Sequence, residues 1–454
     1  MGSTGINLNG STATSGAGID VTSVVSQILA NESAPVHLLK AQLNQLGSDQ
    51  VTLTGFNTSL ATLLAKVNAL SDISGALTSR TAASSRTDLL TATADTSATS
   101  GQHTIVVSNL ANGSSYDTDP LTDGNTQFAT GSFQLQLGTA SPTTITVDST
   151  NNTLSGLASS INAQNLGVSA SVVTDANGAR LSLVSNSTGL PADLTISGNT
   201  TSLNFNKTAN AANASLQVDG VPISSATNVV TGVIGGVTLN LLSASPGSPI
   251  TLKVAPATAA AQQAVSDFVT AYNSTINAVD QQFAYDPATG SAGSLSSSGD
   301  LRSLQTQLLS ESTYSISGNN GYTTLASLGI NLNNDGTLSV DNAKLSDTLA
   351  NHFTEFQTFF QSATGQTGFA QKLSADLQNL TDPTQGLLNV AITQNRTDQK
   401  AIQSSINDFD DRLATRKAQL TAQYSRVDAT LRAFPLLLAQ INGELNSLST
   451  TSTK

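Results

Sequence analysis

The strongest pattern in this sequence is a long helical repeat near its C-terminal end. Apolar residues recur at alternating steps of four and three between residues 402 and 448, with Arg416 at one of these positions and one extra step of four between Leu420 and Tyr424. Such steps keep apolar side chains on one supercoiling face of a helix, and the extra step is a stutter. The pattern therefore predicts a long helix that needs a partner along its apolar face. The predicted seam residues are Ile402, Ile406, Phe409, Leu413, Leu420, Tyr424, Val427 and Leu431.

A second repeat lies near the N-terminal end. Its seam residues, spaced seven residues apart, are Leu39, Leu46, Leu53, Leu60 and Val67. A second apolar row lies three residues further along the sequence. This spacing also predicts a supercoiling helix, although Gly47 and Gly55 inside it each cost about 1 kcal/mol relative to Ala. A shorter helix precedes it, with Asp20 as its N-cap, and Pro35 should end or bend that helix.

The two repeats are expected to pair within one chain, residues 39–67 against residues 402–431. The alternative, that these apolar faces meet another subunit, stays open at this point. Pro435 should interrupt the terminal helix because proline lacks a backbone N–H. Four apolar residues keep the helical steps beyond it and have no matching stripe elsewhere in the sequence, so contacts with other chains are expected for them: Leu438, Ile441, Leu445 and Leu448.

Between the repeats the sequence changes to short alternating strands separated by Gly, Asn, Asp and Pro, as in β-rich domains. The predicted strands are 91–94, 104–108, 132–137, 144–147, 180–184, 193–196, 215–218, 237–241 and 250–254. One helix is predicted around 154–161, another over 265–279, and a hairpin over 330–340 with Asp335-Gly336 as its turn. The predicted fold class is α+β and multidomain, with long coiled-coil helices from both termini forming a stalk and β-rich domains inserted between them.

Composition excludes several classes of function. The net charge is −12 and only 11% of residues are charged, so nucleic acid and anionic membrane surfaces are not expected partners. No cysteine is present, which excludes disulfides and thiolate metal sites. No apolar run approaches the ~18 residues that a membrane span needs. The first residues have neither the charged nor the apolar part of a signal peptide, so a cleaved one is not expected.

Candidate catalytic residues are few, and none forms a recognisable site. His37, His103 and His352 are far apart in the sequence, so surface or capping roles are favoured over a metal or catalytic role. Asn331, Asn333 and Asp335 imitate a calcium loop, but Asn342 stands where the loop needs a closing Glu, and a hairpin turn explains the same residues. The acidic run at Asp408, Asp410 and Asp411 is better explained as a solvated helix face than as a paired-carboxylate site. Neither catalysis nor a cofactor is predicted.

Several segments, taken in order, resemble the flagellar hook-associated protein 2 family, the proteins that cap flagellar filaments. The segment Gly18-Ile-Asp-Val-Thr-Ser-Val-Val-Ser-Gln-Ile-Leu29 looks like the opening of that family, and Ser108-Asn-Leu-Ala111 like the close of its N-terminal region. Residues 152–183 are similar to an insert shared by flagellins and hook-associated proteins. The segments 218–223, 235–241, 268–273 and 328–345 look like its C-terminal region. The order of these motifs over most of the chain carries the resemblance, since no single one is decisive.

The resemblance implies a secreted structural protein at the tip of the flagellar filament, exported without a cleaved signal peptide. It implies a homo-oligomeric cap ring that helps flagellin to fold and insert. The implied partners are the protein itself, flagellin, the flagellar export apparatus and a dedicated export chaperone. The expected domains are a leg and stalk at 1–80, an inner head at 81–115 plus 212–256, an outer insert at 116–211, and a helical stalk with the terminal leg at 257–454.

Two other functions remain open at this point. The exposed Ser/Thr/Asn-rich β domains would also suit an adhesin that binds glycans or mucin. A flagellin or hook-junction protein would share the helical ends and the inserted middle.

Overall fold

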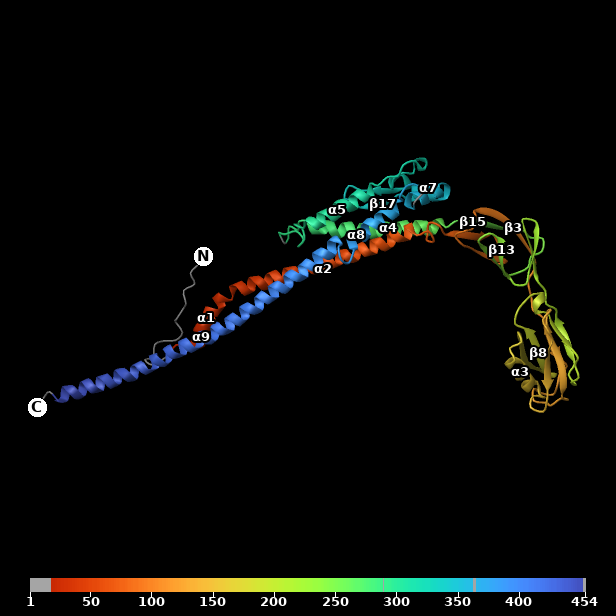
Figure 1. The fold of residues 1–454 in the computed structure, drawn as a ribbon, viewed down its shortest axis with the longest axis horizontal. Helices are drawn as coiled ribbons and strands as arrows, with labels where there is room; N and C mark the ends of the chain where they lie inside the picture. The colour runs from red at the N-terminus through yellow and green to blue at the C-terminus, as the bar shows by residue number, and fades with distance from the viewer. Residues whose placement is uncertain (1–17, 289, 362–364, 452–454) are drawn as a thin grey trace. The chain divides into compact units, whose positions relative to one another are not determined.

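The computed structural model describes residues 18–288, 290–361 and 365–451, with side chains described as far as Asn446 in the last helix. The chain forms two compact units. The helical unit comprises Met1–Asn68, Ser266–Asp341 and Ser362–Lys454, and the strand-rich unit comprises Ala69–Val265 and Asn342–Gln361. Mixed helix and sheet with more than one β domain is the architecture expected from the sequence (Figure 1).

Long helices dominate the helical unit. In chain order its elements are α1 (Val21–Glu32), α2 (Ala34–Ser71), α4 (Thr258–Phe283), α5 (Gly299–Ser312), the hairpin of β16 (Ile330–Leu332) and β17 (Leu338–Val340), α8 (Phe369–Thr381) and α9 (Leu387–Thr451). Figure 1 shows α2 and α9 running side by side, and the Gln399 side chain of α9 donates a hydrogen bond to the Leu46 carbonyl of α2 at 3.2 Å. Helices from the N-terminal and C-terminal parts of the sequence therefore lie side by side in this unit (Figure 1).

Two prolines act differently on these helices. Helix α1 ends at Glu32, and Pro35 lies in the first turn of α2, where a backbone N–H is not needed. Helix α9, in contrast, continues through Pro435, so the prediction that this proline interrupts the terminal helix was wrong. The surrounding residues are exposed, so water can hydrate the carbonyl that would have accepted the missing N–H.

Helices α4 and α8 pack against the second half of α2, and α5 packs on α4. Phe268 and Phe369 meet edge to face with ring centroids 5.7 Å apart. The Lys66 ammonium on α2 lies 2.8 Å from the Asp267 carboxylate on α4, and the Ser374 hydroxyl on α8 donates to Asn68 at 2.6 Å. These contacts explain why the later residues of the α2 repeat are more deeply buried than the earlier ones.

The strand-rich unit contains two separate β cores. The first packs a five-stranded antiparallel sheet against a three-stranded one, in the orders β1-β15-β3-β11-β12 and β13-β14-β2. Its core includes Leu90, Ile105 and Leu239, each without exposed surface. The strands are β1 (Arg80–Ser84), β2 (Leu90–Ala94), β3 (Gly101–Asn109), β11 (Ala214–Val218), β12 (Val221–Ser225), β13 (Val229–Ile234), β14 (Val237–Leu241) and β15 (Ile250–Pro256).

The second core is inserted into the first between β3 and β11. It packs the sheets β10-β4-β8-β7 and β6-β5-β9 with helix α3 (Leu154–Ala163) around Phe133, Ile145 and Leu181. The two chain crossings meet where Asn112 and Ala212 exchange backbone hydrogen bonds of 3.0 and 3.1 Å. The strands are β4 (Ser115–Thr118), β5 (Gly131–Leu137), β6 (Thr143–Val147), β7 (Val168–Asp175), β8 (Gly178–Ser185), β9 (Leu194–Ser197) and β10 (Phe205–Ala209).

Helices α6 (Asn342–Asn351) and α7 (Phe353–Phe360) complete this unit. Phe356, Phe359 and Phe360 are fully buried, and the Gln361 side chain donates to the carbonyls of Leu70 and Asp72 at 3.3 and 3.0 Å.

A fragment of residues 80–257 should fold without the rest of the chain, because each of its two cores is closed by its own strands. We expect one or two cooperative transitions on heating, followed by circular dichroism. In the same fragment Phe133→Ala should lower the free energy of unfolding by about 3–5 kcal/mol, the usual cost of emptying a buried aromatic site. A fragment that melts without cooperativity would contradict the autonomy of these domains.

Candidate assembly surface

Helix α1 packs on α9 and is held there by apolar and ionic contacts. Val24 and Val25 are buried, and they are among the residues of α1 with the least exposed surface. At the C-terminal end of α1, the Glu32 carboxylate lies 3.4 Å from the Arg416 guanidinium of α9. This pair is about half exposed to solvent, so it contributes little to stability and serves chiefly to align the two helices.

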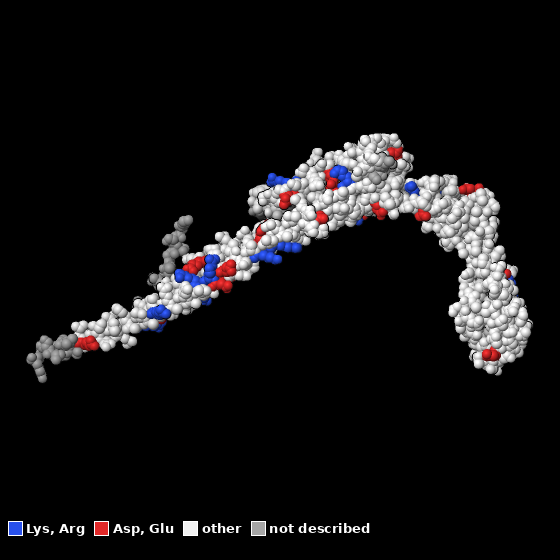
Figure 2. Space-filling model, in the orientation of Figure 1, with Lys and Arg blue, Asp and Glu red and all other residues white. Residues whose placement is uncertain are grey.

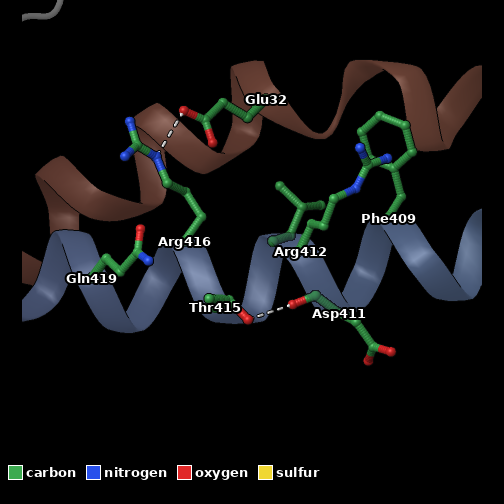
Figure 3. Close-up of a pocket in the computed structure, with 8 residues that line it drawn as sticks. Glu32, Phe409, Asp411, Arg412, Thr415, Arg416 and Gln419 are labelled. Atoms are coloured by element: carbon green, nitrogen blue, oxygen red, sulfur yellow. Dashed lines mark hydrogen bonds and ion pairs between the residues drawn. The ribbon is translucent and has the colours of Figure 1, made fainter.

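An open groove of about 600 Å³ lies beside that ion pair (Figure 3). Its lining residues are Glu32, Phe409, Asp411, Arg412, Leu413, Thr415, Arg416 and Gln419. The Arg412 guanidinium lies 4.1 Å from the centre of the Phe409 ring, a cation–π contact. Figure 3 shows the Asp411 carboxylate pointing away from α1, so no pair of carboxylates faces the groove.

The seam residues differ in burial along the two helices. On α2, Leu53, Leu60 and Val67 are buried, whereas Leu39 and Leu46 are half-buried. On α9, burial decreases towards the C-terminus. The buried seam residues there are Ile406 and Leu420, the half-buried ones are Ile402, Phe409, Leu413 and Tyr424, and the exposed ones are Val427 and Leu431. Intrachain cover of α9 therefore decreases over residues 420–431.

Beyond that point α9 carries an exposed apolar surface, which we call the terminal apolar segment. It consists of Phe434, Leu436, Leu437, Leu438, Ile441 and Leu445, whose exposed fractions run from 44% at Ile441 to 74% at Leu436. No charged residue occurs between Arg432 and Glu444, and Figure 2 shows neither blue nor red atoms on the visible face there. Leu448 lies outside the residues whose side chains are described.

Leu436 and Leu437 were missed by the sequence analysis. Neither residue belongs to the stripe of three-residue and four-residue steps from which contact residues were predicted. The absence of charge on every face of the helix from residue 433 to 443 was the available signal. Exposed apolar surface of this extent is typical of interaction sites.

The other candidate residues have local roles. His37 is exposed, and His352 precedes α7 at its N-cap position. The His103 ring nitrogen Nδ1 lies 2.7 Å from Asp219, and this hydrogen bond, with one from the Thr104 N–H, lowers the pKa of the Asp219 carboxyl. Asp335 accepts hydrogen bonds from the backbone and hydroxyl of Thr337 inside the hairpin turn. Asp408 and Asp410 are exposed on α9.

Among the described residues, no group of three or more His, Asp and Glu side chains is placed to hold a metal ion. The described helices also include none that is long and apolar enough to cross a membrane.

Comparison with known proteins identifies the family. The N-terminus of flagellar hook-associated protein 2 matches residues 17–114, its C-terminus matches residues 211–434, and the flagellin hook IN motif matches residues 132–187. The chain is 32% identical to the B-type flagellar hook-associated protein 2 of Pseudomonas aeruginosa, over 90% of this chain and 92% of that protein. This chain belongs to the flagellar hook-associated protein 2 family. The resemblance found in the sequence is thereby confirmed.

Two further relatives agree with membership of this family. The flagellar hook-associated protein 2 of Escherichia coli K12 is 29% identical over 92% of this chain and 94% of its own length. The crystal structure of the D1-D2-D3 domains of the flagellar cap protein FliD from Escherichia coli superposes with a TM-score of 0.60 at 30% identity. The superposition covers 76% of this chain and 99% of the Escherichia coli chain.

The same substitution, Leu to Asp, at two positions of α9 should distinguish the buried part of the helix from the exposed part. Leu420 is 4% exposed and Leu438 is 47% exposed. Leu420→Asp buries a carboxylate without a partner and should lower the free energy of unfolding by about 3 kcal/mol or more. Leu438→Asp should change it by no more than about 0.5 kcal/mol. Urea denaturation followed by circular dichroism measures both, and equal effects would mean that the two positions do not differ in burial.

Proposed function

We propose that this chain is a structural protein that caps the distal end of the bacterial flagellar filament as a homo-oligomer and is required for filament elongation and motility. The observation that carries the proposal is the similarity to flagellar hook-associated protein 2 over at least nine-tenths of the chain, with matches at both of its ends. The cap interpretation is favoured over a surface adhesin by the same comparisons. In this role the cap promotes folding and insertion of flagellin at the growing tip.

We propose further that α2 and α9 form a coiled-coil stalk. Support comes from the seven-residue spacing of Leu53, Leu60 and Val67, all buried, and from the hydrogen bond between Gln399 and the Leu46 carbonyl. The strand-rich domains, 81–115 plus 212–256 and 116–211, would then form the head of the cap. The helical residues 1–80 and 257–454 would form its stalk and legs.

The C-terminal part of α9, residues 436–454, is called the terminal leg. We propose that it makes the contacts between subunits or with the filament. Leu438, Ile441, Leu445 and Leu448 are the proposed contact residues, to which the structure adds Leu436 and Leu437. Support comes from the exposure of the described members of this set and from the absence of charged residues between 433 and 443. A partner helix that covers them would remove apolar surface from water at roughly 25 cal/mol per Å².

Flagellin and other copies of the chain are the proposed partners at the filament tip, outside the cell. The flagellar export apparatus and a dedicated export chaperone are proposed partners before assembly, with export that needs no cleaved signal peptide. Support for these last proposals comes from family membership alone. No catalytic activity, cofactor, nucleic acid or membrane contact forms part of the proposal.

Removing the terminal leg should abolish capping and leave the fold intact. Deleting residues 436–454 removes side chains that are exposed as far as they are described, to Asn446, and leaves the packing of α1 and α2 on α9 in place. The truncated chain should unfold at the same urea concentration as the full chain. Expressed in a strain that lacks its own cap protein, it should not restore swimming in soft agar, and unassembled flagellin should accumulate in the medium.

A matched control for the deletion is Val390→Asp, a substitution at an exposed apolar position of the same helix that lies far from the terminal leg. This variant should swim normally. If the truncated chain also restores swimming, the terminal leg does not grip the filament. If the full chain fails to restore it under the same conditions, the capping function itself is wrong.

A further inference from the structure

Asp428 of α9 makes a bond to Ile19, which precedes helix α1. Its Oδ1 accepts a hydrogen bond from the backbone N–H of Ile19 at 2.8 Å, and its Oδ2 accepts one from Nε of Arg432 at 2.8 Å. The carboxylate is only 17% exposed, in contrast to the exposed Asp408 and Asp410 of the same helix. Both of its oxygens are therefore used in charge-assisted bonds, which are stronger than neutral ones.

Gly18 allows this close approach. A Cβ atom built on Gly18 would overlap Oδ1 of Asp428 and would lie 2.6 Å from Nε of Arg432. The ends of the Asp428 and Arg432 side chains would have to move to make room for a side chain at residue 18, which would weaken the bond between Asp428 and the Ile19 N–H. The absence of a side chain at residue 18 and the carboxylate at residue 428 are thus complementary.

The same contact lies at the N-terminal end of helix α1. Asp20 is its N-cap and accepts a hydrogen bond from the Ser23 N–H at 3.0 Å. The Asp428 carboxylate accepts its hydrogen bond from Ile19, one residue before Asp20. It therefore lies at the positive end of the helix dipole, where negative charge is favourable. At the other end of α1, Glu32 pairs with Arg416. Helix α1 is therefore attached to α9 at both ends, with Val24 and Val25 buried between them.

The position of Asp428 along α9 has a consequence for assembly. The bonds from residues 18–32 to α9 reach Arg416 and Asp428, and the terminal apolar segment begins six residues after Asp428, at Phe434. The Asp428 contact therefore coincides with the end of the paired part of α9.

We propose that Asp428 is a positioning residue of the cap, which holds Gly18–Asp20 on α9 and so determines where the paired helices end and where the terminal apolar segment begins. The anchoring itself rests on the contacts above. Its importance for filament growth rests on the proposed capping function, so the experiment reads the two separately.

Hydrogen–deuterium exchange of the full chain, read by mass spectrometry over residues 18–32, measures the anchoring. Asp428→Ala removes both bonds and should speed exchange in this segment about tenfold, the loss expected for one charge-assisted hydrogen bond. Gly18→Ala should do the same from the other side of the contact. Because Asp428→Ala removes the Oδ1 atom that the new methyl group would overlap, the double variant should exchange no faster than Asp428→Ala alone. Asp428→Asn keeps an acceptor for the Ile19 N–H and should fall between wild type and Asp428→Ala.

The matched control is Asp410→Ala, which removes the same charge from an exposed position of the same helix and should leave exchange unchanged. Global unfolding in urea should be the same for all variants, since the contact lies at the end of the paired helices. In a strain that lacks its cap protein, Asp428→Ala and Gly18→Ala should restore swimming poorly, whereas Asp410→Ala should restore it fully.

Unchanged exchange in Asp428→Ala would overturn the anchoring. Faster exchange together with normal swimming would overturn its role in assembly. A large drop in global stability would make Asp428 an ordinary core contact and would also overturn the proposal. If the wild-type chain does not restore swimming, the capping function fails, and the exchange data still decide whether Asp428 anchors the N-terminal segment.

Discussion

Helix α2 presents an apolar face that must be covered, and the cover comes from residues more than two hundred positions later in the chain. Lys66 meets Asp267, Asn68 meets Ser374, and the Leu46 carbonyl meets Gln399. Burial of Leu60 and Val67 supplies the free energy, while these polar contacts define which helices lie together. Because residues from the two ends of the chain are joined in one unit, the strand-rich domains have to be insertions between them.

Burial against neighbouring helices also explains why the side chains of α9 become more exposed along its length. Its first turns are covered, with Leu388 and Ile392 buried, and its last described side chains are exposed on every face. A helix of this length cannot be stabilised by its propensity alone where it lacks neighbours, and Pro435 weakens it further. An uncharged apolar surface at such a place is unfavourable in an isolated chain. Its retention is understandable if the segment is covered by a partner in the assembled state.

Much of the local structure could be predicted from residue patterns. The period of seven located α2 and α9, and the strand alternations 132–137, 215–218 and 237–241 correspond to β5, β11 and β14. These elements were predictable because side-chain spacing follows backbone geometry directly. Pro435 was predicted wrongly, since the cost of a missing N–H depends on whether the freed carbonyl can reach water. The contact between Gly18 and Asp428 could not be predicted from the sequence. The two residues are 410 positions apart, and neither stands out from the residues next to it in the sequence.

The sequence by itself determined the long helices near its two ends, many of the strands between them and the resemblance to a family of filament caps. Each of these depends on short-range spacing or on residue types, which are readable without coordinates. Only the tertiary structure decided which apolar residues are covered. Leu420 and Leu438 continue one stripe on one helix, yet one is buried and the other exposed. Burial depends on neighbours that are distant in the sequence, such as α1 packed on α9, and no local pattern records them.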